Sequence, residues 1–506
     1  MNTMLALPKV IVEIDGAQLA LSDAATLEEV RVQQRLSLPT LCEITFRDPP
    51  GPLAAVSKIS PGADLQVTVQ GHAEPLFIGQ VTAVEHVYEP ARGREVRVRG
   101  YDRLHRLRKR QSVRAHVQVT LRDLAQELTA ELGLSVQVAQ AGPIWPRLIQ
   151  HRQSDLELLA ELAEQSGLYL ALRGNTLHLL TLEGIDEPLP LVLGESLLEA
   201  RLEVNGDPAC RSVTASGWDP LQVKTFAGHA TQARVGREVG ADVTPGQVGA
   251  SGERALVNEA AHTDDQAGNL AQAELDWRVA REVTLWGIAE GDPRLQPGAL
   301  IMVTGVDDAL AGKYVLTLVT HTIDHRRGFV SEISTTPLPL HPRAISSVVA
   351  LGVVTSVGDP DNLARIKVSL PAYEDVETDW MDVVSPGAGS QKGLITLPDV
   401  GDRVLVLLAH EDPGQGVVLG GLYGMPGAPD SGVEQGAVQR YTLLTRGGQR
   451  VRLDDAHNTV RVENSQGSYV ELSPTKVKVH AEVDLEIEAP GKAVVIRGNT
   501  IDMERA

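Results

Sequence analysis

Carboxylates and histidines are the residues of this 506-residue chain that could do chemistry, as general acids, general bases or metal ligands. One acidic group is Asp155, Glu157, Glu161 and Glu164. Apolar residues recur between these carboxylates at helical spacing. We therefore interpret them as the solvated face of a helix and not as paired catalytic carboxylates.

The histidines and cysteines give no pattern of a metal site or a nucleophile. None of the 14 histidines falls in an HExxH pattern, so we expect His321 to be structural and His480 to be solvated. Cys42 and Cys210 are far apart with no CxxC spacing, and we expect both to be buried as small apolar residues. No P-loop or GxSxG motif occurs. The sequence predicts no enzyme, no catalytic residue, no cofactor and no bound metal.

Composition sets the class of protein. The length suggests about three or four domains, and with only 3% aromatic residues the cores must be aliphatic. A net charge of −20 argues against nucleic-acid binding, and we interpret the basic stretch 103–110 as a solvated edge. Residues 1–14 do not resemble a signal peptide, and no apolar run is long enough to span a membrane. We expect synthesis and assembly in the cytoplasm.

The elements that must position these residues are mostly short strands. Residues 1–340 alternate between apolar and polar types in runs such as 10–14, 65–69 and 96–99, typical of barrel-like β domains. Helices interrupt this pattern. Thr120 and Ser154 are good N-caps, each followed by apolar residues at helical spacing. The two helices should end at glycines, and a third helix is predicted over 264–280. These features are consistent with barrel-like domains that carry inserted helices.

The stretch 336–342 is rich in proline and marks a domain boundary, and the linker 341–347 separates residues 1–340 from a second domain, 348–424. We expect this domain to be a small closed barrel of the OB type, because short strands with Gly, Asp and Pro turns fill it. The expected strands are 350–357, 365–370, 381–384, 393–397, 403–408 and 416–422.

A second linker, 425–442, leads to the region 443–506. Here apolar and charged residues alternate strictly over thirteen positions, which predicts one dry and one charged face. The predicted dry face, the core of a needle, is Val477, Val479, Ala481, Val483, Leu485, Ile487 and Ala489. Glu482, Asp484, Glu486 and Glu488 lie on the charged face.

So long an apolar face on about 65 residues cannot be buried by the segment itself, since small domains hide little surface. Identical chains wound about one axis would bury the dry faces against each other and pair the open strand edges. We therefore predict a triple-stranded β-helix or β-prism needle, formed as a homotrimer. The alternative is half of a β-sandwich lying against another domain of the same chain.

Several motifs resemble a known family. Residues 1–340 resemble the late-control-D/VgrG hub family, which implies that they form a hub region, and the second domain resembles phage baseplate assembly protein V. The hub motifs are GYDRLHRL at 100–107, QHRQSDLELLAELA at 150–163, QPG at 296–298, GKYVL at 312–316 and VTH at 319–321. The motifs of the second domain are GVV at 352–354, RIKV at 365–368, PDVGDRVLV at 398–406 and GGLYG at 420–424.

This resemblance implies the structural, membrane-piercing spike and baseplate hub of a contractile, phage-tail-like injection system. Its implied partners are two further copies, the inner tube protein, baseplate wedge proteins, a separate PAAR-type tip protein and effector cargo, with only transient contact to the target membrane. The end of the chain at Ala506 leaves no room for a fused tip. A particle released from the cell, a type VI secretion VgrG and a contractile-phage spike remain open, as does a glycan-binding or cell-wall-degrading particle protein. In some phage relatives a lysozyme domain fills the position of linker 425–442, which is too short for one here.

Overall fold

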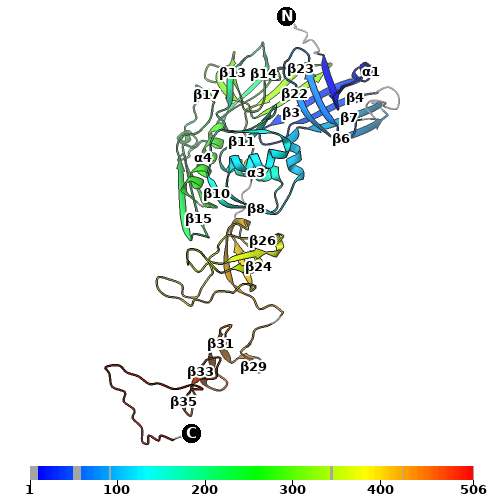
Figure 1. Ribbon diagram of the computed structural model, residues 1–506. Coiled ribbons are helices and arrows are strands. Elements are labelled where there is room, and N and C mark those ends of the chain that lie inside the picture. Colours follow the sequence, from blue (N-terminus) through cyan, green and yellow to red (C-terminus); the bar gives the residue numbers. More distant parts are fainter. Residues whose placement is uncertain are drawn as a thin grey trace. The chain divides into compact units, whose positions relative to one another are not determined.

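Strands dominate the computed structural model, which describes residues 9–48, 59–90, 93–261, 263–341, 346–425 and 427–504 (Figure 1). The chain divides into two compact units, Met1–Gly421 and Leu422–Ala506, called here the body and the tail. Within the body we call residues 9–341 the hub and residues 346–421 the collar. The prediction of a mainly β protein with a few helices is confirmed. Residues 342–345 of the first predicted linker lie outside the described residues.

An eleven-stranded sheet joins the two ends of the hub sequence, because β22 (Leu318–Asp324) pairs antiparallel with β3 (Leu27–Arg35). Alternation in its strands sends Val12, Val67 and Val98 into one core, as the sequence pattern predicts. The other strands, in spatial order, are β14 (Leu197–Val204), β19 (Val283–Glu290) and β23 (Gly328–Ser334) on one side, and β4 (Leu41–Arg47), β7 (Gly93–Tyr101), β6 (Phe77–Glu89), β5 (Asp64–Val69), β1 (Val10–Ile14) and β2 (Ala17–Gln18) on the other. A short helix, α1 (Leu21–Ala24), follows β2.

Two capped helices build a second hub core, and both were predicted. α2 (Leu121–Thr129) starts after Thr120, whose hydroxyl accepts the Asp123 N–H at 3.2 Å. α3 (Asp155–Gln165) starts after Ser154, whose backbone N–H donates to the Glu157 carboxylate at 2.8 Å. Their apolar faces pack together with small strands: β8 (Arg114–Thr120) with β10 (Ile144–Gln150), and β9 (Ser135–Val138), β12 (Thr176–Leu180) and β11 (Tyr169–Arg173).

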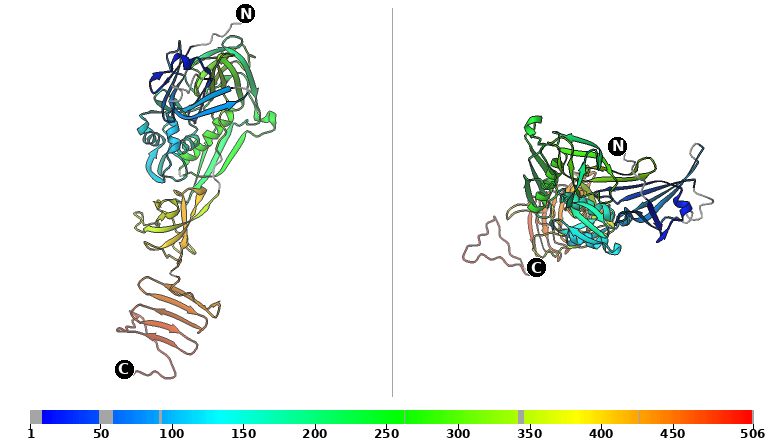
Figure 2. Two further views of the ribbon diagram at one scale, coloured as in Figure 1. Left: turned by 90° about the vertical axis from the view of Figure 1, so that its right-hand side faces the viewer. Right: turned by 90° about the horizontal axis from the view of Figure 1, so that it is seen from above.

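The third predicted helix, α4 (Asp264–Ala280), has the predicted bounds and packs on a three-stranded sheet (Figure 2). That sheet is β16 (Lys224–Ala230), β15 (Ser212–Asp219) and β18 (Glu253–Glu259). A further four-stranded sheet is β13 (Ile185–Val192), β20 (Ala299–Thr304), β21 (Gly312–Val315) and β17 (Glu238–Val239). The 3-10 turns of the hub are Arg103–Lys109, Ala130–Leu132 and Pro245–Val248.

The collar is a five-stranded antiparallel sheet around one aliphatic core. Its strands are β26 (Val376–Glu377), β25 (Lys367–Leu370), β24 (Val348–Ser356), β27 (Arg403–Leu408) and β28 (Gly416–Gly421), with 3-10 turns at Pro371–Tyr373 and Ala409–Glu411. The strand predicted at 393–397 is wrong: Gly393 has φ +144° and Ile395 is 79% exposed in a loop. The strand predicted at 381–384 is reduced to isolated bridges, such as Met381 with Ile366.

The hub and the collar are in direct contact inside the body. Leu221, at the tip of the β15–β16 hairpin, packs against the collar core. Arg152 Nη2 donates to Glu411 Oε2 at 2.7 Å, and the rings of His151 and Tyr373 meet edge to face at 5.6 Å. These contacts join the two domains through apolar packing, an ion pair and a ring contact.

The tail is an antiparallel meander of five strands lying side by side in chain order (Figure 2). The strands are β31 (Arg440–Leu444), β32 (Arg450–Asp454), β33 (Thr459–Glu463), β34 (Tyr469–Leu472) and β35 (Val477–His480). A small hairpin, β29 (Val433–Glu434) with β30 (Ala437–Val438), and the start of β31 lie inside the predicted linker 425–442, so that stretch is partly ordered into strands. Each strand is short, and each turn leads directly into the neighbouring antiparallel strand.

Candidate interaction surface

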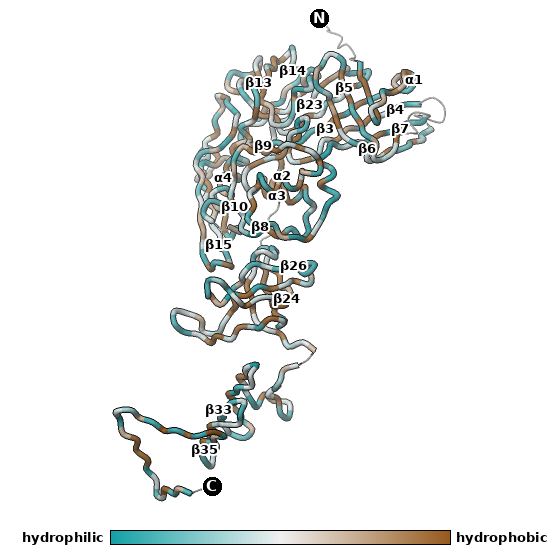
Figure 3. Tube along the Cα trace, viewed as in Figure 1, coloured by the Kyte–Doolittle hydropathy of each residue, from teal (hydrophilic) through white to brown (hydrophobic). Residues whose placement is uncertain are grey.

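The register of the tail sheet places apolar residues directly opposite one another on one face. Strict alternation within each strand and antiparallel pairing between strands extend this match across all five strands. The first row is Leu443, Val451, Val462, Val470 and Val479, and the second row is Tyr441, Leu453, Val460, Leu472 and Val477. We call these two rows the apolar face of the tail; Figure 3 colours the trace by hydropathy and shows brown and teal residues interspersed along the tail.

The apolar face is more exposed to water than the charged side chains behind it. Val462 is 50% exposed and Val479 is 57% exposed. The side chain of Arg461 is 29% exposed and that of Glu463 only 18%. A soluble domain normally has the reverse distribution, since burying apolar surface drives folding by roughly 25 cal/mol per Å². A contiguous apolar surface of this kind marks a site that a partner covers.

The opposite face of the tail is held together by charges. Arg461 donates from Nε to Glu463 at 2.7 Å and from Nη1 to Glu471 at 3.2 Å, and its guanidinium lies 3.8 Å from the centre of the Tyr469 ring. Partial burial alone would lower the pKa of Arg461, but the two carboxylates raise it. Arg450 extends the network to Glu463 at 3.1 Å. These contacts form a network of ion pairs within the chain, although Nε of Arg450 and Nε of Arg452 are buried without a hydrogen-bond partner among the described residues.

The seven predicted core residues fall into two groups in the structure. Val477 and Val479 lie in β35 on the apolar face. The other five come after β35, in a segment that forms no strand among the described residues: Ala481, Val483, Leu485, Ile487 and Ala489. Val483 and Leu485 line the same groove, of about 520 Å³, as the row from Leu443 to Val479. The role of all seven as a trimer core stays a prediction.

Sequence reasoning missed that β31 to β34 contribute more to this surface than β35 alone. Their alternating runs were visible, but each is only four or five residues long. The signal that could have found the rows is the turn length, because the turns fix which residues face each other. Short turns with glycine, such as the one closed by Gly448 (φ +86°), set that register.

One acidic residue of α3 does not lie on a solvated face, which corrects the sequence interpretation. Asp155 is only 3% exposed. Its carboxylate accepts from Gln150 Nε2 at 2.9 Å and lies 3.1 Å from Arg110 Nε. The Arg110 and Gln150 side chains come from other segments, so the helix pattern could not reveal them. Asp155 therefore anchors the start of α3 to its neighbours.

The two histidines discussed from the sequence have different environments. His321 is fully buried: its Nε2 donates to the Leu295 carbonyl at 3.1 Å, and its Nδ1 lies 2.8 Å from the Ser331 hydroxyl. Burial lowers the pKa of His321 to about 4, so the ring is neutral at pH 7. His480 is not merely solvated, since its Nε2 lies 2.8 Å from Glu482 Oε1. The structural role expected for His321 agrees with these contacts.

The remaining chemical groups give no reactive site among the residues that the structure describes. Cys42 and Cys210 are buried free thiols, as predicted, and burial raises the pKa of Cys42. No group of three or more His, Cys, Asp or Glu side chains in the described ranges is placed to hold a metal ion. Within the same ranges, the helices are all too short or too polar to cross a bilayer.

Two protein families match parts of the chain. Residues 350–423 match the family described as type VI secretion system/phage-baseplate injector OB domain. This match confirms the OB fold predicted for the collar. Residues 6–325, which are more than half of the chain, match the family described as Alg8 N-terminal domain. No curated protein sequence matches the chain.

Solved structures share the fold at low sequence identity. A chain of the Francisella PdpA-VgrG complex, in its half-lidded form, is 9% identical with a TM-score of 0.56, over 95% of this chain and 89% of that one. The E. coli c3393 protein, described as a type VI secretion component similar in structure to the T4 bacteriophage tail proteins gp27 and gp5, is 14% identical with a TM-score of 0.54, over 81% of this chain and 99% of that one. The fold of a VgrG-like spike, indicated by the sequence motifs, is confirmed. By its match over residues 6–325, the chain belongs to the Alg8 N-terminal domain family.

Proposed function

We propose that the chain is the central spike and hub of a contractile, phage-tail-like injection system. The single observation that carries the proposal is the exposed apolar face of the tail, which follows an injector OB domain in the same chain. A monomer with this exposed apolar surface would tend to aggregate in water, whereas a closed assembly would bury the surface in its core. The role is mechanical and not catalytic.

In this proposal three copies of the chain bury the apolar face of the tail. Each strand contributes two residues to the apolar face, and both edge strands, β31 and β35, leave backbone groups unpaired within the tail sheet. Three such sheets around one axis form a prism whose inner surface is the two apolar rows. The charged network of Arg461 then faces outward. A shaft with a dry interior and hydrogen-bonded walls resists bending when the surrounding sheath contracts.

The partners in this proposal follow the order of the domains. The hub would meet the inner tube protein and the baseplate wedges, and the tip of the tail would carry a separate PAAR-type protein, with effector cargo travelling on the assembly. The Francisella relative is described in a complex with PdpA, which supports assembly with further proteins for chains of this fold. Contact with the target membrane would be brief.

In this proposal the protein is made and assembled in the cytoplasm and acts as part of an injection particle. Release of a free particle, a type VI secretion apparatus and a contractile phage differ in the genes that accompany the spike. Sheath, tube and tail-fibre genes without membrane-complex genes would favour a free particle or a phage. Membrane-complex genes beside this one would favour a type VI system.

Light scattering of the purified full-length protein tests the proposal directly. The expected mass is about three times 54.3 kDa. A stable monomer at micromolar concentration, with the apolar face still exposed, would overturn the trimeric shaft. Incubation with peptidoglycan fragments tests the catalytic alternative, and turnover of the fragments would contradict a purely mechanical role.

A further inference from the structure

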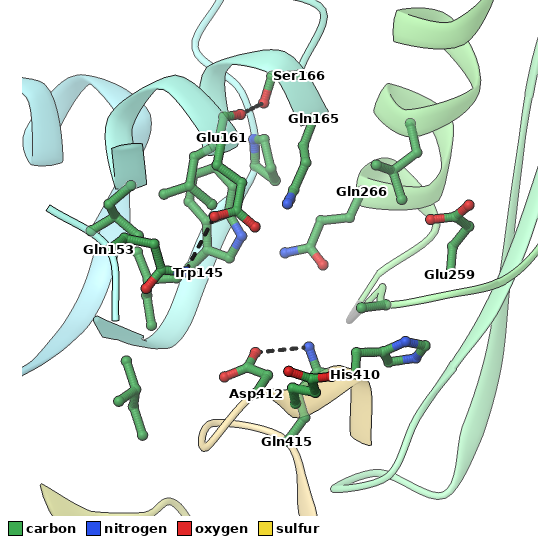
Figure 4. Close-up of a pocket in the computed structure, with 18 of the residues that line it drawn as sticks. Trp145, Gln153, Glu161, Gln165, Ser166, Glu259, Gln266, His410, Asp412 and Gln415 are labelled. Atoms are coloured by element: carbon green, nitrogen blue, oxygen red, sulfur yellow. Dashed lines mark hydrogen bonds between the residues drawn. The ribbon is translucent and has the colours of Figure 1, made fainter. Parts of the chain in front are cut away.

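Two hollows in the body differ in the charges that line them. The cavity between hub and collar, of about 450 Å³, is lined by the carboxylates of Glu161 and Asp412 and also by Arg147 and Arg152 (Figure 4). A groove of about 540 Å³ on the hub is lined, among the residues described, by two arginines and by no carboxylate. The chain carries a net charge of −20, so the sign of the charge is reversed locally at this groove.

The groove lies where strand ends of the large sheet meet the end of α4 and the segment 336–340. Arg35 ends β3, and the register places it beside Leu318 of β22, which in turn lies beside Ser334 of β23. All three residues line the groove, as does Arg281, the residue directly after α4. The segment 336–340 contributes prolines and a leucine. The groove is therefore part of the folded hub and not of a free loop.

The apolar part of the groove is held in place by the hub. Trp277 Nε1 donates to the Leu338 carbonyl at 2.6 Å, and the Leu338 side chain packs against a buried cluster of the hub. These contacts fix the segment 336–340, whose Pro339 is exposed and whose Leu340 is half-buried in the groove. Proline rings also restrict the backbone of this segment. Binding to such a preformed surface orders few additional groups, which lowers the entropic cost of binding.

The two arginines of the groove have N–H donors that no other part of the hub uses. Arg35 and Arg281 are half-buried, and neither side chain forms a hydrogen bond or an ion pair with the rest of the described chain. The guanidinium carbon of Arg281 lies 4.5 Å from the centre of the Trp277 ring, a cation–π contact that uses the face of the group and none of its N–H donors. The neighbouring carboxylate of Glu282 is engaged by Arg211 at 2.6 Å. A guanidinium has five N–H donors and no acceptor, so both arginines can donate to an anion.

We propose that this groove docks an acidic segment of a partner polypeptide, in which carboxylate side chains flank an apolar one. The carboxylates accept charge-assisted hydrogen bonds from Arg35 and Arg281. The apolar side chain packs on Trp277, Pro339 and Leu340. A volume of about 540 Å³ suits a short segment, since small-ligand sites span roughly 300–1,000 Å³. Tryptophan and arginine are also enriched among the residues that dominate the binding free energy of protein interfaces. This docking needs only the hub, and it does not rest on the function proposed above.

Titration of the full-length protein with acetyl-Glu-Leu-Glu amide, followed by ligand-observed NMR, tests the groove. Acetyl-Gln-Leu-Gln amide removes the charges, and acetyl-Glu-Ser-Glu amide removes the apolar side chain; both should bind more weakly. Arg35→Gln and Arg281→Gln should each weaken binding of the first peptide by roughly fivefold or more, because each removes a charge-assisted contact. Arg326→Gln should leave binding unchanged, since Arg326 is exposed at the turn of the β22–β23 hairpin, opposite to the end at Leu318, and does not line the groove. Circular dichroism checks that each variant is folded.

Saturable binding to the wild-type protein that depends on both arginines, on the carboxylates and on the leucine of the peptide supports the docking groove. Equal binding of the uncharged peptide, an unchanged affinity in Arg35→Gln and Arg281→Gln, or no binding would overturn it. Displacement of the peptide by an equal concentration of inorganic phosphate would also overturn it, since the arginines would then select an anion and not a peptide. Binding seen only in Val462→Lys, which is designed to dissociate the assembly, would mean that a second copy of the chain and not a separate partner covers the groove.

Discussion

Val462 and Val470 face each other across strands β33 and β34 of the tail, and they are 50% and 43% exposed. Cross-strand valine pairs stabilise a sheet when they are covered, since each buried valine contributes roughly 1.5–3 kcal/mol. In a single chain this pair gains little of that free energy. In the proposed trimer the pair would link the stability of the tail to assembly.

Val462→Lys should dissociate the assembly, because it places a charge in the middle of the proposed dry interior. Light scattering should show the mass falling from about three times 54.3 kDa towards a single chain. Leu444→Lys is the matched control, since Leu444 lies on the charged face, opposite Arg450. An unchanged mass in Val462→Lys, or equal dissociation by both variants, would contradict the assignment of the apolar face.

Arg461→Ala should destabilise the tail by only about 1 kcal/mol, because exposed ion pairs and a cation–π contact contribute little individually. Arg461→Lys should lie between wild type and alanine, since it keeps the charge but loses the planar group over Tyr469. Thermal unfolding of the tail measures both effects. A loss as large as that of Val462→Lys would mean that the charged face, and not the apolar one, holds the assembly together.

Leu221→Ala should loosen the contact between hub and collar by about 1–2 kcal/mol, because its side chain packs against the collar core. Hydrogen exchange in β24 and β27 should become faster as the collar opens more often. Val223→Ala, on the same hairpin tip but 70% exposed, is the control and should leave exchange unchanged. Equal protection in both variants would show that the collar does not depend on this contact.

The local structure of the hub could be predicted from sequence because its signals are local. Thr120 and Ser154 with their capping partners fixed the starts of two helices. The apolar run 393–397 was misread as a strand, because alternation cannot separate a strand from an exposed apolar loop. The same limit hid the burial of Asp155, whose partner Arg110 is distant in sequence.

The candidate surface was predicted only in part. Alternation over 477–489 predicted a dry face, which stays a prediction, and the structure continues the strand no further than His480. Beyond it, residues such as Leu485 have no strand of the described chain beside them, and an extended segment needs such a neighbour to form a ladder. The sequence of one chain indicates only indirectly whether its strands pair with those of another chain. The hub–collar cavity could not be predicted, because Glu161 and Asp412 are about 250 residues apart.

The contribution of His321 to the stability of the body should rise with pH between about 4 and 6.5. Its ordinary pKa of 6.5 falls to about 4 in the folded protein, since the ring is buried and its Nε2–H donates to the Leu295 carbonyl. Between these values the unfolded chain binds more protons than the folded one, so lowering the pH favours unfolding. Above pH 6.5 the contribution of His321 no longer changes with pH. Between pH 4 and 6.5 this contribution to the free energy of unfolding changes by on the order of 3 kcal/mol.

The check is urea unfolding of wild type and His321→Gln from pH 4.5 to 7.5, with exposed His229→Gln as the control. Burial raises the pKa of Asp102 from its ordinary 3.8 to about 6, which makes its own contribution fall as pH rises through that range. Because Asp102 is present in all three proteins, its contribution cancels when each variant is compared with wild type. The difference between wild type and His321→Gln should therefore grow with pH up to 6.5 and then level off, while His229→Gln follows wild type. A difference that does not change with pH would mean that His321 is protonated, or accessible to water, in the folded body.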